Sequence, residues 1–149
     1  TQDPWLPWNW NNPEALHGLL PRHQHHRLLP AGKSAKVMQR LHATPASELC
    51  VPMQVVAELR VGATKSAKPT ENAAKVASFI KPYAVLWPDS NITDHYVAIR
   101  CALEAKGQCI SEADLWIAAT ARSRGDVVVT NNVDEFRRVP GLVVEDWTV

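Results

Sequence analysis

The stretch that decides the fold is Ser111-Glu-Ala-Asp-Leu-Trp-Ile-Ala-Ala-Thr-Ala, followed after Gly125 by Val127-Val-Val-Thr-Asn-Asn. A polar residue precedes an apolar helical pattern, a glycine follows it, and a run of valines then ends in a polar turn. A helix joined to a short apolar strand is the repeating unit of a parallel α/β sheet. Such sheets carry their chemistry at the carboxyl ends of the strands. Here a strand end and a helix start both bear oxygen-containing side chains.

The same alternation extends through most of the chain. The segment Met53–Val61 fits either a strand end or a helix. The remaining pattern predicts helices over residues 33–42, 72–79 and 111–124, and strands over 48–51, 84–87, 127–129 and 142–145. It also predicts a helix that is capped by Ser90 or Asn91 and runs to residue 106. We therefore expect an α/β fold of three layers, a central parallel sheet flanked by helices, over residues 32–149.

Residues 1–31 differ from the rest of the chain. They contain five prolines, and three tryptophans occur within the first ten residues. Proline removes a backbone donor and restricts the residue before it, so regular structure is disfavoured here. We predict an irregular or aberrant N-terminal segment, with at most a short helix over 14–20.

Composition limits the class of protein. A length of 149 residues suits one domain, and a formal net charge of +1 produces no strong field for a polyanion. Three cysteines without CxxC spacing argue against a disulfide framework and suit a reducing compartment. No apolar run has the length needed to cross a bilayer. We expect a cytoplasmic protein without a membrane partner.

Two acids and a carboxamide form the candidate site: Glu58, Asp114 and Asn132. Each has an ordinary alternative. Asp114 suits the first turn of a helix as a dipole partner, Glu58 suits an exposed helix face, and Asn132 suits a turn. Together, however, oxygen ligands on separate elements are what a hard divalent ion requires. Such an ion can activate water and stabilise a phosphoryl transition state.

Three blocks of sequence carry a family resemblance. They are Ala57-Glu-Leu-Arg-Val-Gly-Ala-Thr-Lys-Ser66, the spaced pattern from Ile99-Arg100 through Gly107 and Asp114 to Ala119, and Val129-Thr-Asn-Asn through Pro140-Gly-Leu to Trp147. In this order they resemble the PIN-domain ribonucleases of the VapC toxin type, over roughly residues 33–149.

The resemblance implies an endonuclease that cleaves RNA with Mg²⁺ or Mn²⁺, is inhibited by a cognate antitoxin and forms a homodimer. It implies that Glu58 and Asp114 bind the metal, and that Asn132 lies where relatives keep a fourth acid or Asn. Thr130 would order that loop, Asp134 and Glu135 are possible substitutes, and Arg100 would support helix packing.

One feature departs from the family. Its members begin with a strand ending in Leu-Asp-Thr-Asn, whose Asp is the first metal ligand, but this chain has no acid between Glu14 and Glu48. Two interpretations stay open. The chain is an endoribonuclease impaired by that loss, or a catalytically inactive PIN-like module that binds RNA or antitoxin. A replacement carboxylate near Glu58 and Asp114 would distinguish them.

The genetic code offers a reason for the departure. Read one base forward, the codons from Pro21 to Arg27 permit Leu-Asp-Thr-Asn-Ile-Ile, the family's opening motif. The junction of His17 and Gly18 permits Met. We therefore predict a shifted reading frame over residues 17–30, with residues 1–16 as upstream sequence. A diverged N-terminus is the alternative.

Overall fold

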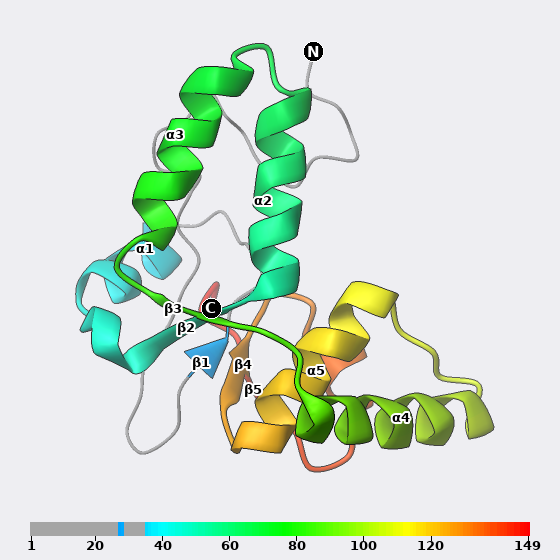
Figure 1. Cartoon of the computed structure of the whole chain (residues 1–149). Coiled ribbons are helices and arrows are strands. Elements are labelled where there is room, and N and C mark those ends of the chain that lie inside the picture. The colour runs from blue at the N-terminus through cyan, green and yellow to red at the C-terminus, as the bar shows by residue number, and fades with distance from the viewer. Residues whose placement is uncertain (1–26, 29–34) are drawn as a thin grey trace.

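A central parallel sheet organises the computed structural model, which describes residues 27–28 and 35–149 (Figure 1). Within these residues the sheet has five strands in the order β3-β2-β1-β4-β5. The strands are β1 (Arg27–Leu28), β2 (Leu49–Pro52), β3 (Ala84–Leu86), β4 (Val127–Val129) and β5 (Val143–Glu145). All four pairings between neighbouring strands are parallel. The carboxyl ends of the strands therefore lie at one edge of the sheet.

Helices connect and flank these strands (Figure 1). They are α1 (Ala35–His42), the short 3-10 helix η2 (Ala46–Glu48), α2 (Met53–Lys65), α3 (Pro69–Ile80), α4 (Ser90–Ala105), α5 (Glu112–Arg124) and α6 (Val133–Phe136). Helices α4 and α5 pack against each other, and α2 packs against α3. Helix α2 also contacts β2, β3 and α5, so it links the two halves of the molecule. This arrangement confirms the α/β class that the sequence predicts.

Local signals set the bounds of α5. The Ser111 hydroxyl accepts a hydrogen bond from the Asp114 backbone N at 3.2 Å, which satisfies a donor in the first turn. Gly125 ends the helix in the left-handed region at φ 68°, where a side chain would be strained. The predicted helix over 111–124 and the strand after it are confirmed.

Two predictions about helix starts needed the structure. The cap of α4 is Asp89, whose Oδ1 accepts from Ile92 N at 2.8 Å, so Ser90 and Asn91 are the wrong residues. Asp89 has extended backbone geometry, with φ −125° and ψ −175°, and its carboxylate can reach back over the first turn. The ambiguous segment Met53–Val61 is helical and begins directly after β2.

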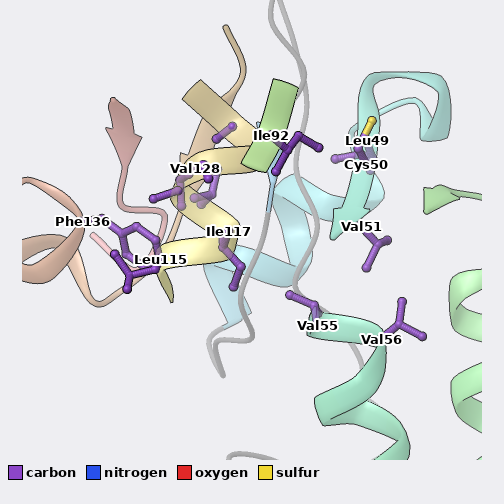
Figure 2. Close-up of a cluster of buried hydrophobic side chains, with 14 of the residues drawn as sticks. Leu49, Cys50, Val51, Val55, Val56, Ile92, Leu115, Ile117, Val128 and Phe136 are labelled. Atoms are coloured by element: carbon purple, nitrogen blue, oxygen red, sulfur yellow. The ribbon is translucent and has the colours of Figure 1, made fainter. Parts of the chain in front are cut away.

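The core lies on both sides of the central strands. Every residue of β2 and β4 is buried, because the strands are paired on both edges and covered by helices. Figure 2 shows Val55 and Val56 of α2, Ile117 of α5 and Phe136 of α6 among these buried side chains. Phe136 anchors α6, so the loop between β4 and α6 is held at both ends.

Strand β1 falls inside the segment that the sequence sets apart. Residues Arg27–Leu28 occupy the centre of the sheet, between β2 and β4. The rest of 1–31, including the expected helix over 14–20, lies outside the described residues. The division at residue 32 and the shifted frame stay predictions. The frame-shifted motif would place Leu-Asp at 21–22, upstream of this strand.

The helices in the described part of the chain are short relative to a bilayer: none is both long and apolar enough to span one.

Candidate functional site

Glu58 and Asp114 lie near each other beside the carboxyl edge of the sheet. Glu58 is in the second turn of α2, which starts immediately after β2, and Asp114 is in the first turn of α5. Glu58 is exposed, yet its carboxyl is crowded by protein atoms. Burial, followed by the negative charge of Asp114, raises the pKa of Glu58 above its ordinary value. The two acids that the sequence predicts as partners are therefore close enough to interact electrostatically.

Asp114 is the centre of the site. Burial raises the pKa of Asp114, and the charge of Glu135 and a hydrogen bond to its carboxyl raise it further. Hydrogen bonds to the side chains of Ser111 and Asn132 act in the opposite direction and lower this pKa. The structure thus brings Asn132 and Glu135, two of the residues predicted from the sequence, to Asp114.

Thr130 organises the loop that carries Asn132. The buried Thr130 hydroxyl accepts from Asn132 N at 2.9 Å, and Thr130 N donates to Glu145 O of β5 at 3.0 Å. These bonds tie the loop to the sheet and hold the Asn132 side chain beside Asp114. The contact is the one expected of a residue that orders this turn.

Asp134 differs from its neighbour Glu135. Adjacent residues on a helix point about 100° apart, and within α6 it is Glu135 that faces Asp114. Asp134 is exposed, and no contact among the described residues joins it to Asp114. Of the two residues, Glu135 is therefore the one that lies beside Asp114, and its role as a substitute stays a prediction.

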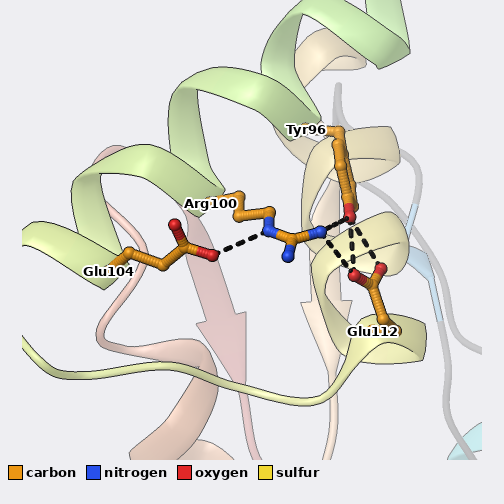
Figure 3. A network of polar contacts seen from close by, with 4 residues as sticks. All are labelled: Tyr96, Arg100, Glu104 and Glu112. Atoms are coloured by element: carbon orange, nitrogen blue, oxygen red, sulfur yellow. Dashed lines mark hydrogen bonds and ion pairs between the residues drawn. The ribbon is translucent and has the colours of Figure 1, made fainter.

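A polar network holds the start of α5 in position (Figure 3). Arg100 of α4 donates to Glu112 at 2.9 Å, to Glu104 at 2.8 Å and to the Tyr96 hydroxyl at 2.8 Å. Tyr96 also stacks on Trp116 with ring centroids 4.1 Å apart. Arg100 therefore supports packing, as predicted. The pocket beside it, about 200 Å³, does not include Glu58 or Asp114.

The charges at the site are unbalanced. In the described part of the chain, Glu58, Asp114 and Glu135 form no ion pair with a basic side chain. Desolvated carboxylates that repel one another are stabilised by a cation. Hard divalent ions such as Mg²⁺ and Mn²⁺ take carboxylate, carboxamide and water oxygens, so the type of these donor atoms matches such an ion.

Gln54 adds an acceptor that the sequence interpretation missed. Its Oε1 is buried and has no hydrogen-bond partner. It lies one turn before Glu58 on the same face of α2, where the spacing of four residues makes the two side chains neighbours. In the sequence, this four-residue spacing from Glu58 is the signal that could have pointed to Gln54. An unsatisfied oxygen suits the waters of a hydrated ion.

The ligand set is nevertheless short. Across residues 27–28 and 35–149, no group of three or more His, Cys, Asp or Glu side chains is arranged to hold a metal ion. Mg²⁺ requires nearly ideal octahedral geometry and keeps several waters. The resemblance predicts a further carboxylate at the end of the first strand, and the strand β1 described here is Arg27–Leu28.

Known proteins resemble this chain in both sequence and fold. Residues 28–142 match the PIN domain family. The tRNA(fMet)-specific endonuclease VapC of Salmonella typhimurium is 44% identical over 101 residues, which cover 68% of this chain and 76% of that protein. The tRNA(fMet)-specific endonuclease VapC of Shigella flexneri is 38% identical over 116 residues, covering 78% of this chain and 87% of that protein.

Solved structures show the same relationship. DNA-bound VapBC from Salmonella typhimurium superposes with a TM-score of 0.77 at 36% identity, covering 83% of this chain and 99% of that chain. VapBC-1 from nontypeable Haemophilus influenzae superposes with a TM-score of 0.65 at 33% identity, covering 67% and 75%. The parallel sheet, the ordered acid blocks and these matches lead to one conclusion: the chain belongs to the PIN-domain family, in its VapC group of ribonucleases.

Proposed function

We propose that this chain is a Mg²⁺- or Mn²⁺-dependent endoribonuclease in which Glu58 and Asp114 bind the ion. The observation that carries the proposal is the convergence of Glu58, Asn132 and Glu135 on Asp114 at the carboxyl edge of the sheet. Thr130 holds the loop that presents Asn132. Glu135 supplies a further carboxylate within a site that lacks the family's first acid.

The proposed chemistry is hydrolysis of an RNA phosphodiester. A bound divalent ion would lower the pKa of water and stabilise charge on the phosphoryl oxygens. Water attacks phosphorus in line with the bond to the 3′ oxygen, and that bond breaks. The products are a 3′-hydroxyl, which gains a proton, and a 5′-phosphate. Glu58 and Asp114 orient the reacting groups, while Asn132 and Ser111 hold the Asp114 carboxyl in place.

The relatives suggest a substrate and a partner. Two of them are named as tRNA(fMet)-specific endonucleases, so we propose RNA as the substrate class and tRNA(fMet) as the first molecule to test. The solved neighbours are VapBC toxin–antitoxin assemblies. We accordingly propose a cognate antitoxin as the protein partner and a homodimer as the toxin's own assembly.

One observation favours a second function. The described residues lack a group of three acids suited to a metal. A PIN-like module that binds RNA or antitoxin without cleaving is therefore the alternative. It requires the fold and surface of the family but no bound ion.

A cleavage assay separates the two functions. The purified chain is incubated with end-labelled tRNA(fMet) in Mg²⁺, in Mn²⁺ and in EDTA. Fragments with 5′-phosphate ends that appear only with a metal, and disappear in Asp114→Asn, support the endoribonuclease. RNA binding of equal strength in all three conditions, with no fragments, supports the inactive module.

A further inference from the structure

Trp87 is a large aromatic side chain that lies outside the hydrophobic core. It leaves 67% of its surface exposed, directly after β3. The other tryptophans in the described residues are engaged in packing. Trp116 stacks on Tyr96, and Trp147 is buried with Arg40 4.9 Å above its ring. Trp87 has no comparable contact within the described part of the chain, so packing does not explain it.

Trp87 lies at the carboxyl ends of the parallel strands, the same end at which the acids lie. Leu86 pairs with Pro52, so the following residues, Trp87 and Met53, are level with each other. Met53 is the first residue of α2, and Glu58 follows about 7 Å along the helix axis. Helix α2 also contacts β3. The backbone of Trp87 is therefore level with the start of the helix that carries Glu58, and it directly follows the outermost strand on that side of the sheet.

The backbone around Trp87 is held on both sides. The ladder with β2 fixes Leu86 before it, and Pro88 restricts φ after it. Asp89 then caps α4 through the bond from Ile92 N at 2.8 Å. A rigid three-residue connection thus presents the indole, and little ordering is needed when a ligand stacks on it.

We infer that Trp87 is a stacking platform for a nucleobase of single-stranded RNA next to the phosphodiester that the acids address. The inference rests on the proposed RNA substrate and adds a substrate-positioning residue to it. An indole face suits any base, because every base presents a π surface. The expected occupant is an unpaired base, since a base within a duplex is already stacked on both faces.

Binding measured without catalysis tests this role. A fluorescein-labelled single-stranded RNA is titrated in EDTA with the parent chain, Trp87→Ala and Trp87→Phe, and Kd is read by anisotropy. The matched control is Val143→Ala, another exposed apolar side chain on the opposite edge strand. A second strand with the same sugar–phosphate backbone but abasic positions keeps the charge and removes the stacking.

Trp87→Ala should weaken binding of the RNA about 5- to 100-fold and leave the abasic strand unchanged. Trp87→Phe should retain most of the affinity, and Val143→Ala all of it. An equal loss of affinity for both strands, or no loss of affinity for either strand, overturns the inference. If no affinity is lost, Trp87 is instead available to contact a protein partner. Circular dichroism confirms that each variant is folded.

Cleavage in Mg²⁺ separates this inference from the proposed function. If the parent cleaves RNA and Trp87→Ala raises KM with kcat unchanged, both the nuclease activity and the stacking role of Trp87 are supported. If the parent cleaves RNA and Trp87→Ala binds RNA as tightly as the parent, the stacking role is wrong and the nuclease activity is supported. If no chain cleaves RNA but Trp87→Ala loses base-dependent affinity, the nuclease activity is wrong and the stacking role is supported.

Discussion

Asp114 combines features that individually destabilise a carboxylate. It is partly buried, it lies beside Glu135 and it interacts electrostatically with Glu58. Hydrogen bonds to Ser111 and Asn132 only partly offset these effects. Acids whose pKa is shifted by burial and by specific neighbours are often found at functional sites. The charge of Asp114 is thus better explained by a function than by stability.

The substitution Asp114→Asn should reduce metal-dependent RNA cleavage by about 1,000-fold or more, since a ligand that stabilises transition-state charge contributes several kcal/mol. Ser111 still caps α5, so the fold should persist. Initial rates on end-labelled RNA measure the effect. Asp134→Asn is the matched control, because Asp134 is an exposed neighbouring acid outside the cluster, and it should cleave like the parent. Equal rates for the parent and Asp114→Asn would mean that Asp114 only complements the dipole of α5.

The same variant should be more stable than the parent at neutral pH. A carboxyl whose folded pKa is raised binds protons more tightly in the folded state, so ionisation costs stability. That cost is absent below the unfolded pKa near 3.8 and grows as pH rises through the folded pKa. In metal-free buffer, Asp114→Asn should melt about 1–3 °C higher at pH 7, with the difference shrinking toward pH 3. A lower Tm at pH 7 would contradict this balance.

At the scale of the element, the start of α5 positions the site. The hydroxyl of Ser111 caps the helix, and Arg100 binds Glu112 in the first turn. Asp114 lies within one turn of these anchors. Disturbing the cap should therefore affect both the helix and the acid.

The substitution Ser111→Ala should lower the free energy of unfolding by about 1 kcal/mol and also reduce cleavage, because Asp114 loses a hydrogen-bond partner. Urea denaturation and initial rates measure the two effects. Ser111→Thr keeps a hydroxyl and should recover most of both. Loss of stability with a fully retained rate would show that the hydroxyl acts on the helix alone.

At the scale of the whole molecule, β1 lies between β2 and β4. Strand β2 leads into the helix that carries Glu58, and β4 leads into the loop that carries Asn132. The family resemblance predicts a first carboxylate at the end of this central strand. The described strand here is Arg27–Leu28. The completeness of the proposed metal site therefore depends on a segment far in sequence from Glu58 and Asp114.

Replacing residues 17–30 by the frame-shifted reading with Leu-Asp-Thr-Asn should raise cleavage well above that of the present chain, which should be weak. Millimolar Mg²⁺ should also raise Tm more in the restored chain, because binding to the folded state stabilises it. The control carries Asn in place of the restored Asp. Strong cleavage by the present chain would show that another group, such as Glu135, replaces the missing ligand. Sequencing the DNA tests the shift itself, since a stop in that frame excludes it.

Some features follow from the sequence alone because their causes are local. Ser111 and Gly125 bound α5 through contacts within a single helical turn. The valines at 127–129 form a strand because a short apolar run favours a buried position. The pairing of Glu58 with Asp114 was expected from ordered motifs, and the structure brings the two together.

Other features were decided only by the tertiary structure, because they depend on partners distant in sequence. Met53–Val61 is equally compatible with strand and helix until α2 packs on β2, β3 and α5. The sequence proposed Asp134 and Glu135 together, and the orientation of α6, anchored by buried Phe136, turned Glu135 to Asp114. Trp87 is an ordinary apolar residue in the sequence. Its exposure directly after β3 arises from the strand order, which places β3 at an edge of the sheet, and no local pattern encodes that order.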